Sequence, residues 1–236
     1  MPSRLTPTMA DLEPAYPVAR APADSAMRRP WTARRALATV GAAGPVVFLA
    51  VSVLAGLLKP GYDIREQAVS DLAVGAHGWL QTANFFALGA AMIASALALA
   101  PACRHGRGSP SAVALLAAAG AGMFTVGLFP TDLVGAPATT SGAVHNTLSL
   151  GVFLALIVAA ALHGRALRRA RTDTGLARYS TLTAIGVFAI LVVFALFAGD
   201  VGDPLHQVSG LIERLFIAGV LAWITVVSRR LLHVAK

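Results

Sequence analysis

Charged side chains are scarce in this sequence, since aspartate, glutamate, lysine and arginine make up 13% of its 236 residues. Soluble domains carry about 25% charged residues, so the composition excludes an ordinary water-soluble globule. The hydrophobic share of 56% also excludes a disordered chain. The single cysteine, Cys103, can form no internal disulfide. The sequence has no glycine-rich phosphate loop, no GxSxG nucleophile elbow and no HExxH zinc motif. No sequence motif therefore indicates an activity.

Hydrophobic runs dominate what is present. Six of them reach about 20 residues, the length that crosses the hydrocarbon core of a bilayer as a helix. They predict an all-α polytopic membrane protein, a compact bundle of six transmembrane helices. The predicted spans are residues 36–58, 79–100, 111–129, 142–163, 179–198 and 208–228. We expect residues 31–236 to form this domain and residues 1–30, with six prolines and no long hydrophobic run, to be a disordered cytoplasmic tail.

The basic residues fall on one side of this predicted topology. Sixteen of the 19 lie before the first span, between spans two and three, between spans four and five, or after span six. The opposite loops hold only Lys59 and Arg65. The positive-inside rule therefore predicts a multi-pass protein of the cell (inner) membrane with both termini in the cytoplasm. The net charge of +8 then reflects orientation, and we expect membrane lipids rather than nucleic acid as partners. The oligomeric state is left open.

Acidic residues and histidines gather at the other, outer end. Asp71 and Asp132 fall in its first two loops, His145 begins the fourth span, and Glu213 lies about one turn inside the sixth. Ionisable residues within a bilayer are costly, so they usually face the bundle and have a partner or a function. We predict that these four supply acid–base groups. Arg214 is rotated by about 100° from Glu213; it is expected to pair with Asp71 or Asp132, and to bind an anionic headgroup or orient a carboxylate.

Ser70, Trp79, Asn84 and His206 complete the candidate binding residues at this end. Zinc ligation by His145, His206 and a carboxylate is an alternative, but the spacing of a zinc motif is missing, and we predict no metal and no cofactor. Small residues spaced by four predict faces for close helix packing. These series are Ala83, Ala87, Ala91 and Ser95; Ala114, Ala118 and Gly122; and Gly151, Ala155 and Ala159.

Three stretches resemble the membrane family catalogued as domain of unknown function 998. They are residues 65–84, which include Ser70 and Asp71; residues 127–132 with 141–145; and residues 210–215. The resemblance covers about residues 40–230 and implies a six-helix prokaryotic integral membrane protein, with no assigned activity. The positions that it points to are Ser70, Asp71, Trp79, Asn84, Pro130, Asp132, His145, Glu213 and Arg214.

These observations favour a polar, titratable site at the outer end that binds or transforms a lipid or isoprenoid-like substrate. The alternative is a non-enzymatic structural or regulatory envelope protein whose buried ion pairs only hold helices together. A small transporter is less favoured, because spans one, three and five carry little polarity beyond Ser52, Thr125 and Thr183. Whether the protein is an enzyme is left open.

Overall fold

The computed structural model describes residues 23–104, 108–197 and 206–233, with side chains described from residue 32 onward except at Phe197 and His206. The chain divides into two units, residues 1–33 and 34–236. In the first unit, residues 23–33 are helical, so the end of the segment predicted as a disordered tail forms helix instead. Residues 1–22 lie outside the described residues. All features below belong to the second unit.

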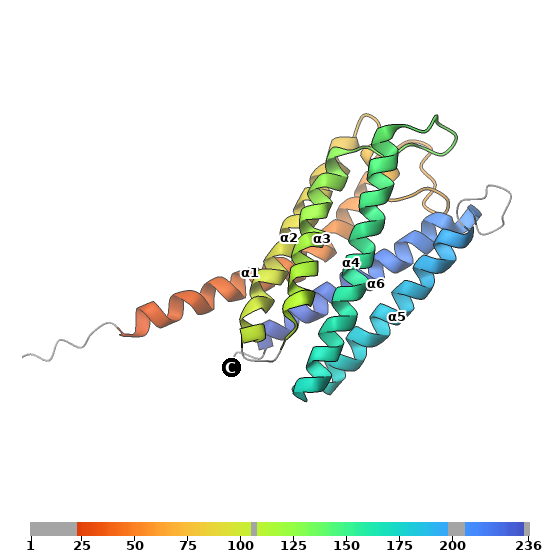
Figure 1. Cartoon of the computed structure of the whole chain (residues 1–236). Helices are drawn as coiled ribbons and strands as arrows, with labels where there is room; N and C mark the ends of the chain where they lie inside the picture. Colours follow the sequence, from red (N-terminus) through yellow and green to blue (C-terminus); the bar gives the residue numbers. More distant parts are fainter. Residues whose placement is uncertain (1–22, 105–107, 198–205, 234–236) are drawn as a thin grey trace, which may run out of the picture. The chain divides into compact units, whose positions relative to one another are not determined.

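The described residues form six α-helices, each long and apolar enough to cross a membrane (Figure 1). This confirms the predicted all-α, six-span fold. The elements are α1 (Ala23–Leu58), η2 (Ser70–Ala73), α2 (Gly78–Arg104), α3 (Pro110–Leu128), α4 (Thr140–Ala170), α5 (Thr174–Phe197), η3 (His206–Val208) and α6 (Ser209–His233). Five helices, α1, α2, α4, α5 and α6, run past their predicted spans toward the arginine-rich segments, because hydrophobicity marks only the part in hydrocarbon. The helix α4, for example, continues until Arg171 adopts a left-handed conformation with φ of 52°.

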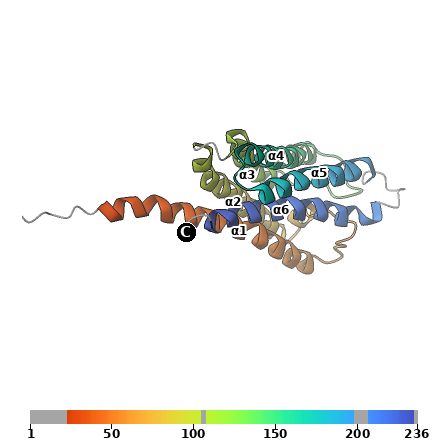
Figure 2. The same cartoon turned by 90° about the horizontal axis from the view of Figure 1, so that it is seen from below.

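Helices α2 to α6 form a closed ring, in which each helix packs against the next and α6 returns to α2 (Figure 2). The backbones of α2 and α3 approach closely at two glycines. A Cβ atom on Gly89 would lie 2.6 Å from the carbonyl oxygen of Gly120, and one on Gly120 would lie 2.7 Å from that of Gly89. The helix α1 joins at Gly44, where a Cβ would lie 2.2 Å from that of Ala91. Small residues therefore let these backbones meet without a hydrophobic driving force.

Half of the small residues predicted from the sequence to form packing faces do not lie in such contacts, whereas Ala91, Ser95 and Ala159 are buried as predicted. Ala83, Ala87, Ala114, Ala118 and Gly151 are exposed, so the prediction of packing faces is wrong at these positions. A step of four residues turns a helix by about 400°, so such a series drifts by about 40° at each step and leaves the face on which it began. The contact between α2 and α3 uses Gly89 and Gly120, which lie outside the series, whereas the contact with Gly44 of α1 uses Ala91, which belongs to it.

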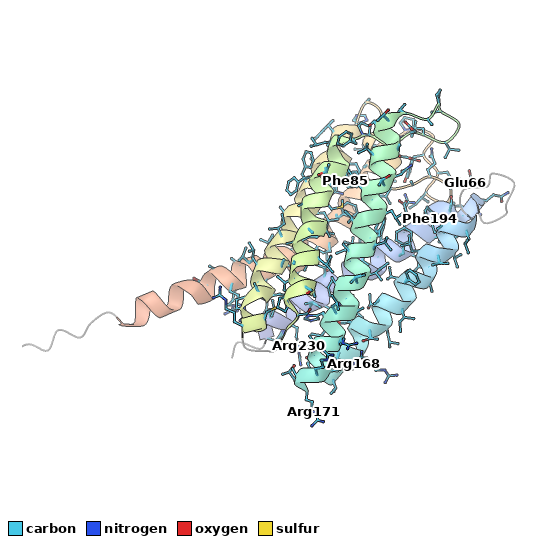
Figure 3. All side chains as sticks on the ribbon, viewed as in Figure 1. Glu66, Phe85, Arg168, Arg171, Phe194 and Arg230 are labelled. Atoms are coloured by element: carbon cyan, nitrogen blue, oxygen red, sulfur yellow. The ribbon has the colours of Figure 1, made fainter. Side chains whose placement is uncertain are left out.

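The two ends of the bundle differ in charge. Figure 3 shows Arg168, Arg171 and Arg230 together at one end and Glu66 at the other. We call the end formed by loops 59–77 and 129–139 and by the start of α6 the carboxylate end, and the opposite one the basic end. At the basic end Arg230 pairs with Asp173, with 2.8 Å between Nε and Oδ2.

Candidate functional site

A cavity of about 430 Å³ opens at the carboxylate end and extends into the bundle. Its polar wall consists of Glu66, Ser70, Asp71, Thr131, Asp132, His145, Asn146, Ser149, Ser209 and Glu213. Its deeper wall is apolar and includes Phe85 of α2 and Phe194 of α5, both labelled in Figure 3. The four residues predicted as acid–base groups, distant in sequence, thus line one cavity. Asn146, Leu150 and Ala195, also in its lining, are exposed, so the cavity opens to the surface beside α4 and α5.

Glu213 is buried in the first turns of α6, with 9% of its surface exposed. The backbone N–H of Val69 donates a hydrogen bond to its Oε2 at 2.7 Å. Its other carboxylate oxygen has no hydrogen-bond partner among the described residues, and no lysine or arginine described here lies within ion-pair distance. Loop 59–77 therefore binds Glu213 through one oxygen and leaves the second facing the cavity.

Asp71 lies in η2, also buried, at 4% exposure. Its Oδ2 accepts a hydrogen bond from the Ala68 N–H at 3.2 Å. The Lys59 ammonium donates to the carbonyl oxygens of Asp71 and Val74 rather than to the Asp71 carboxylate. Burial raises the pKa of Asp71 above its usual range, against the opposing effects of the Ala68 hydrogen bond and the charge of Lys59. Asp71 is thus a second buried carboxyl group with one hydrogen-bonded oxygen.

The ring of His145 makes one hydrogen bond to the described residues and a tilted ring contact with Phe85. Its Nδ1 lies 2.7 Å from the carbonyl oxygen of Phe129. Because a carbonyl oxygen only accepts, Nδ1 must carry a proton, and in the neutral ring Nε2 then has the free lone pair. No described residue donates to Nε2, and the side chain lines the cavity. In its neutral form, the ring therefore presents the Nε2 lone pair to whatever occupies the cavity.

Asp132 has a different environment, because both of its oxygens are engaged in local structure. The Thr139 N–H donates to Oδ2 at 2.8 Å and the Thr139 hydroxyl to Oδ1 at 2.7 Å. Thr139 in turn caps α4 by accepting from the Gly142 N–H at 3.1 Å. These two hydrogen bonds lower the pKa of Asp132 below its usual range. Asp132 contributes negative charge to the cavity wall, but both of its oxygens accept hydrogen bonds from Thr139 at the start of α4.

Arg214 does not pair with Asp71 or Asp132, so that prediction is wrong. Its guanidinium donates to the carbonyl oxygens of Ile64 at 3.0 Å, Gln67 at 2.8 Å and Gly210 at 2.8 Å, and to the hydroxyl of Tyr62. Adjacent helical residues point about 100° apart, so Arg214 faces loop 59–77 while its neighbour Glu213 lines the cavity. The two adjacent residues therefore have separate partners, and those of Arg214 are three backbone carbonyls and the Tyr62 hydroxyl.

Gly210 permits this docking of the loop on α6. A Cβ at Gly210 would lie 2.5 Å from the carbonyl oxygen of Gln67 and 2.8 Å from that of Ile64. The N–H of Leu211 also donates to the carbonyl oxygen of Arg65 at 3.2 Å. Burial raises the pKa of the Tyr62 phenol to about 12, so Tyr62 remains a neutral partner of the guanidinium over the physiological pH range.

The remaining predicted binding residues separate into three groups. Ser70 lines the cavity. Trp79, 68% exposed, and Asn84 are not part of its lining; Asn84 instead donates to the carbonyl oxygen of Phe48 at 3.0 Å and to the side chains of Ser52 and Gln81. The side chain of His206 lies outside the described residues. Within the described part of the chain, no three histidine, cysteine, aspartate or glutamate side chains form a group that could hold a metal ion.

The sequence places Ser149 on the same helix face as His145, because the two are four residues apart, and Ser149 does line the cavity. Sequence reasoning missed other polar lining residues, among them Asn146 and Ser209. The same spacing of four would have identified Ser209, which precedes Glu213 by four residues. Glu66, which is exposed, contributes to the cavity from loop 59–77. Its participation depends on how that loop folds over α6.

The fold and the site together define a membrane protein with six apolar helices and a cavity that is polar at one end and apolar within. The chain belongs to the family described as "Protein of unknown function (DUF998)", whose profile matches residues 42–230. The resemblance noted in the sequence is thereby confirmed over nearly the same range. Comparison with curated proteins and with solved structures finds no match.

Proposed function

We propose that this protein binds, and through His145 can transform, a lipid or isoprenoid-like amphiphile in the cavity at the carboxylate end. The observation that carries the proposal is the cavity itself, which combines an apolar interior with a polar wall containing Asp71, His145 and Glu213. Its volume of about 430 Å³ falls within the range of roughly 300–1,000 Å³ that is typical of small-molecule sites.

The shape of the lining favours a chain-bearing ligand. On α4 the lining residues extend from His145 to Leu156, a rise of about 16 Å along the helix. Beyond the polar wall the lining turns apolar, with Met92, Leu156 and Leu221 among the buried residues around it. An alkyl or isoprenoid chain would bury apolar surface there while its polar end stays at the carboxylate end.

The distribution of basic residues supports an orientation of this cavity in the cell membrane. The positive-inside rule assigns the basic end to the cytoplasm, and with it both termini of a cell-membrane protein. The cavity then opens at the outer leaflet, beside α4 and α5, where exposed lining residues such as Leu150 adjoin the lipid.

The acid–base part of the proposal depends on His145. A neutral imidazole whose Nδ1–H is held by a carbonyl oxygen presents Nε2 as a base, the arrangement that general acid–base catalysis requires. The purely structural alternative depends on buried ion pairs between helices. Among the described residues, neither Glu213 nor Asp71 has such a pair, and this observation favours a ligand site over a structural network.

Two valine-to-phenylalanine variants on α6 test the proposal. Val220 is buried and lines the cavity, whereas Val226 is 40% exposed on the same helix. Protein extracted from membranes in a mild non-ionic detergent is measured by native mass spectrometry for a co-purifying lipid. We expect about one bound lipid per chain in the wild type and in V226F, and loss of that lipid in V220F.

A monodisperse V220F protein that retains the lipid would contradict the proposal. If V220F does not fold, Val126→Phe on α3 fills the same cavity from another wall and serves as the second variant. Incubation of the wild type and of His145→Ala with the lipid that co-purifies then tests the transformation. Product that forms only with the wild type supports the role of His145, and product formed equally by both refutes it.

A further inference from the structure

The charged residues in the cavity wall share one sign. Four carboxyl side chains line it: Glu66, Asp71, Asp132 and Glu213. No lysine or arginine is among the described lining residues, and His145 is the only nitrogen base. A phosphate or carboxylate group would therefore meet like charge, which is unfavourable.

Two basic side chains near the site, Arg214 and Lys59, are hydrogen-bonded to groups of loop 59–77. The guanidinium of Arg214 is held by the carbonyl oxygens of Ile64 and Gln67 and by the Tyr62 hydroxyl. The ammonium of Lys59 is held by the carbonyl oxygens of Asp71 and Val74. Both therefore fasten loop 59–77, and neither is placed to bind an anionic headgroup. The expected role of Arg214 as a headgroup ligand is not supported by these contacts.

The cavity wall offers hydrogen-bond acceptors that lack donors. Glu213 has one oxygen bound to the Val69 N–H, and Asp71 has one bound to the Ala68 N–H. The other oxygen of each carboxylate, and Nε2 of His145, receive no hydrogen bond from any described residue. Buried carboxylates without a countercharge are costly, so a bound group that supplies both donors and positive charge would offset that cost.

We infer that the polar end of the ligand is an ammonium group, so that the cavity takes a long-chain amine in preference to a chain that ends in phosphate or hydroxyl. This inference rests on the proposed function and narrows it to one headgroup chemistry. Asp71 and Glu213 accept hydrogen bonds from the ammonium, while Glu66 and Asp132 add negative charge around it. The alkyl or isoprenoid chain occupies the apolar interior.

Three probes with the same chain separate the headgroup chemistries: dodecylamine, dodecanol and dodecyl phosphate. Each is titrated into the full-length protein in nanodiscs of an uncharged lipid, and binding is read by native mass spectrometry. We expect dodecylamine to bind about tenfold more tightly than either other probe, as hydrogen bonds between charged partners imply. Equal or tighter binding of dodecanol or dodecyl phosphate would overturn the inference and leave the proposed function intact.

Matched variants locate the selectivity. Asp71→Asn and Glu213→Gln each remove one carboxylate from the cavity wall, whereas Asp63→Asn removes one from an exposed loop position outside it. The first two should lower the affinity for dodecylamine about tenfold with little change for dodecanol, and D63N should change neither. An amine preference that survives both cavity substitutions refutes the assignment to these carboxylates. Failure of all three probes to bind the wild type counts against the proposed function itself.

Discussion

Replacement of Arg214 by methionine tests how loop 59–77 is held over the cavity. Methionine keeps an unbranched chain of similar length but removes the guanidinium. The substitution eliminates three contacts to the loop, namely those to the carbonyl oxygens of Ile64 and Gln67 and to the Tyr62 hydroxyl. At about 1 kcal/mol net for each of these partly exposed hydrogen bonds, the free energy of unfolding should fall by about 3 kcal/mol.

For a chain of this size, 1 kcal/mol corresponds to a shift of about 2–4 °C in Tm, so R214M should melt roughly 6–12 °C below the wild type. The assay is thermal unfolding of purified protein in a non-ionic detergent, followed by tryptophan fluorescence. Arg65→Met in the same loop is the control, because Arg65 is exposed and its described hydrogen bonds use only its backbone. This control should shift Tm by no more than a surface substitution does.

A double-mutant cycle then distinguishes the observed contacts from the ion pair that the sequence predicts. Arg214→Met and Tyr62→Phe should be non-additive, because each removes the same hydrogen bond. Arg214→Met and Asp132→Asn should add to within about 0.5 kcal/mol, because the two side chains share no contact. Additivity with Tyr62→Phe, or clear coupling to Asp132→Asn, would refute this account of how the loop is anchored.

Three further predictions follow from the geometry of the same end. Because hydrogen bonds lower the folded-state pKa of Asp132, its stabilisation should be present above the usual aspartate pKa and lost as pH falls. The Tm of the wild type should therefore fall more steeply toward acid pH than the Tm of D132N, and equal slopes would contradict this assignment. Because burial raises the pKa of Asp71, the contribution of Asp71 to stability should favour the fold at low pH and be lost as pH rises. The Tm of the wild type relative to D71N should therefore decline with increasing pH. A difference in Tm that rises with pH would contradict the assignment. Gly142→Ala should destabilise the protein, because a Cβ there would lie 2.1 Å from Oδ2 of Asp132. Gly151→Ala on the same helix meets open space and should be neutral or stabilising. Equal melting temperatures for the two variants would refute this interpretation.

Much of the fold was predictable because one physical requirement dominates it. A helix in hydrocarbon must be long and apolar, so the six spans and their approximate limits can be read from hydrophobicity. The helix ends were less predictable. The arginine-rich end of α4 leaves the hydrophobic run, but its backbone hydrogen bonds continue to Ala170, where the left-handed Arg171 ends the helix. The hydropathy of the sequence does not indicate the residue at which the helical hydrogen bonding ends.

The membership of the site was more predictable than its contacts. Burying an ionisable group in a membrane is costly, so Glu213, His145 and Asp71 could be selected as residues facing the interior. Their partners depend on loop geometry, which the pattern of residue types does not encode. The carbonyl oxygens that hold Arg214 belong to whichever residues the loop brings near, and carbonyls are present at every position of the chain.

The error over Arg214 changes the chemistry that the site can perform. An arginine paired with Asp71 would have cancelled one cavity charge and offered a phosphate its usual partner. With the guanidinium directed to backbone carbonyls, Asp71 and Glu213 carry a negative charge that Arg214 does not cancel whenever they are ionised, and each keeps one oxygen without a donor among the described residues. Asp71 and Glu213 each receive one backbone N–H, which fixes the direction of the carboxylate without neutralising it. Under the proposed function, a cavity built this way would select for ligands that bring their own donors, and the docking of loop 59–77 on α6 would then contribute to its specificity as well as the lining residues.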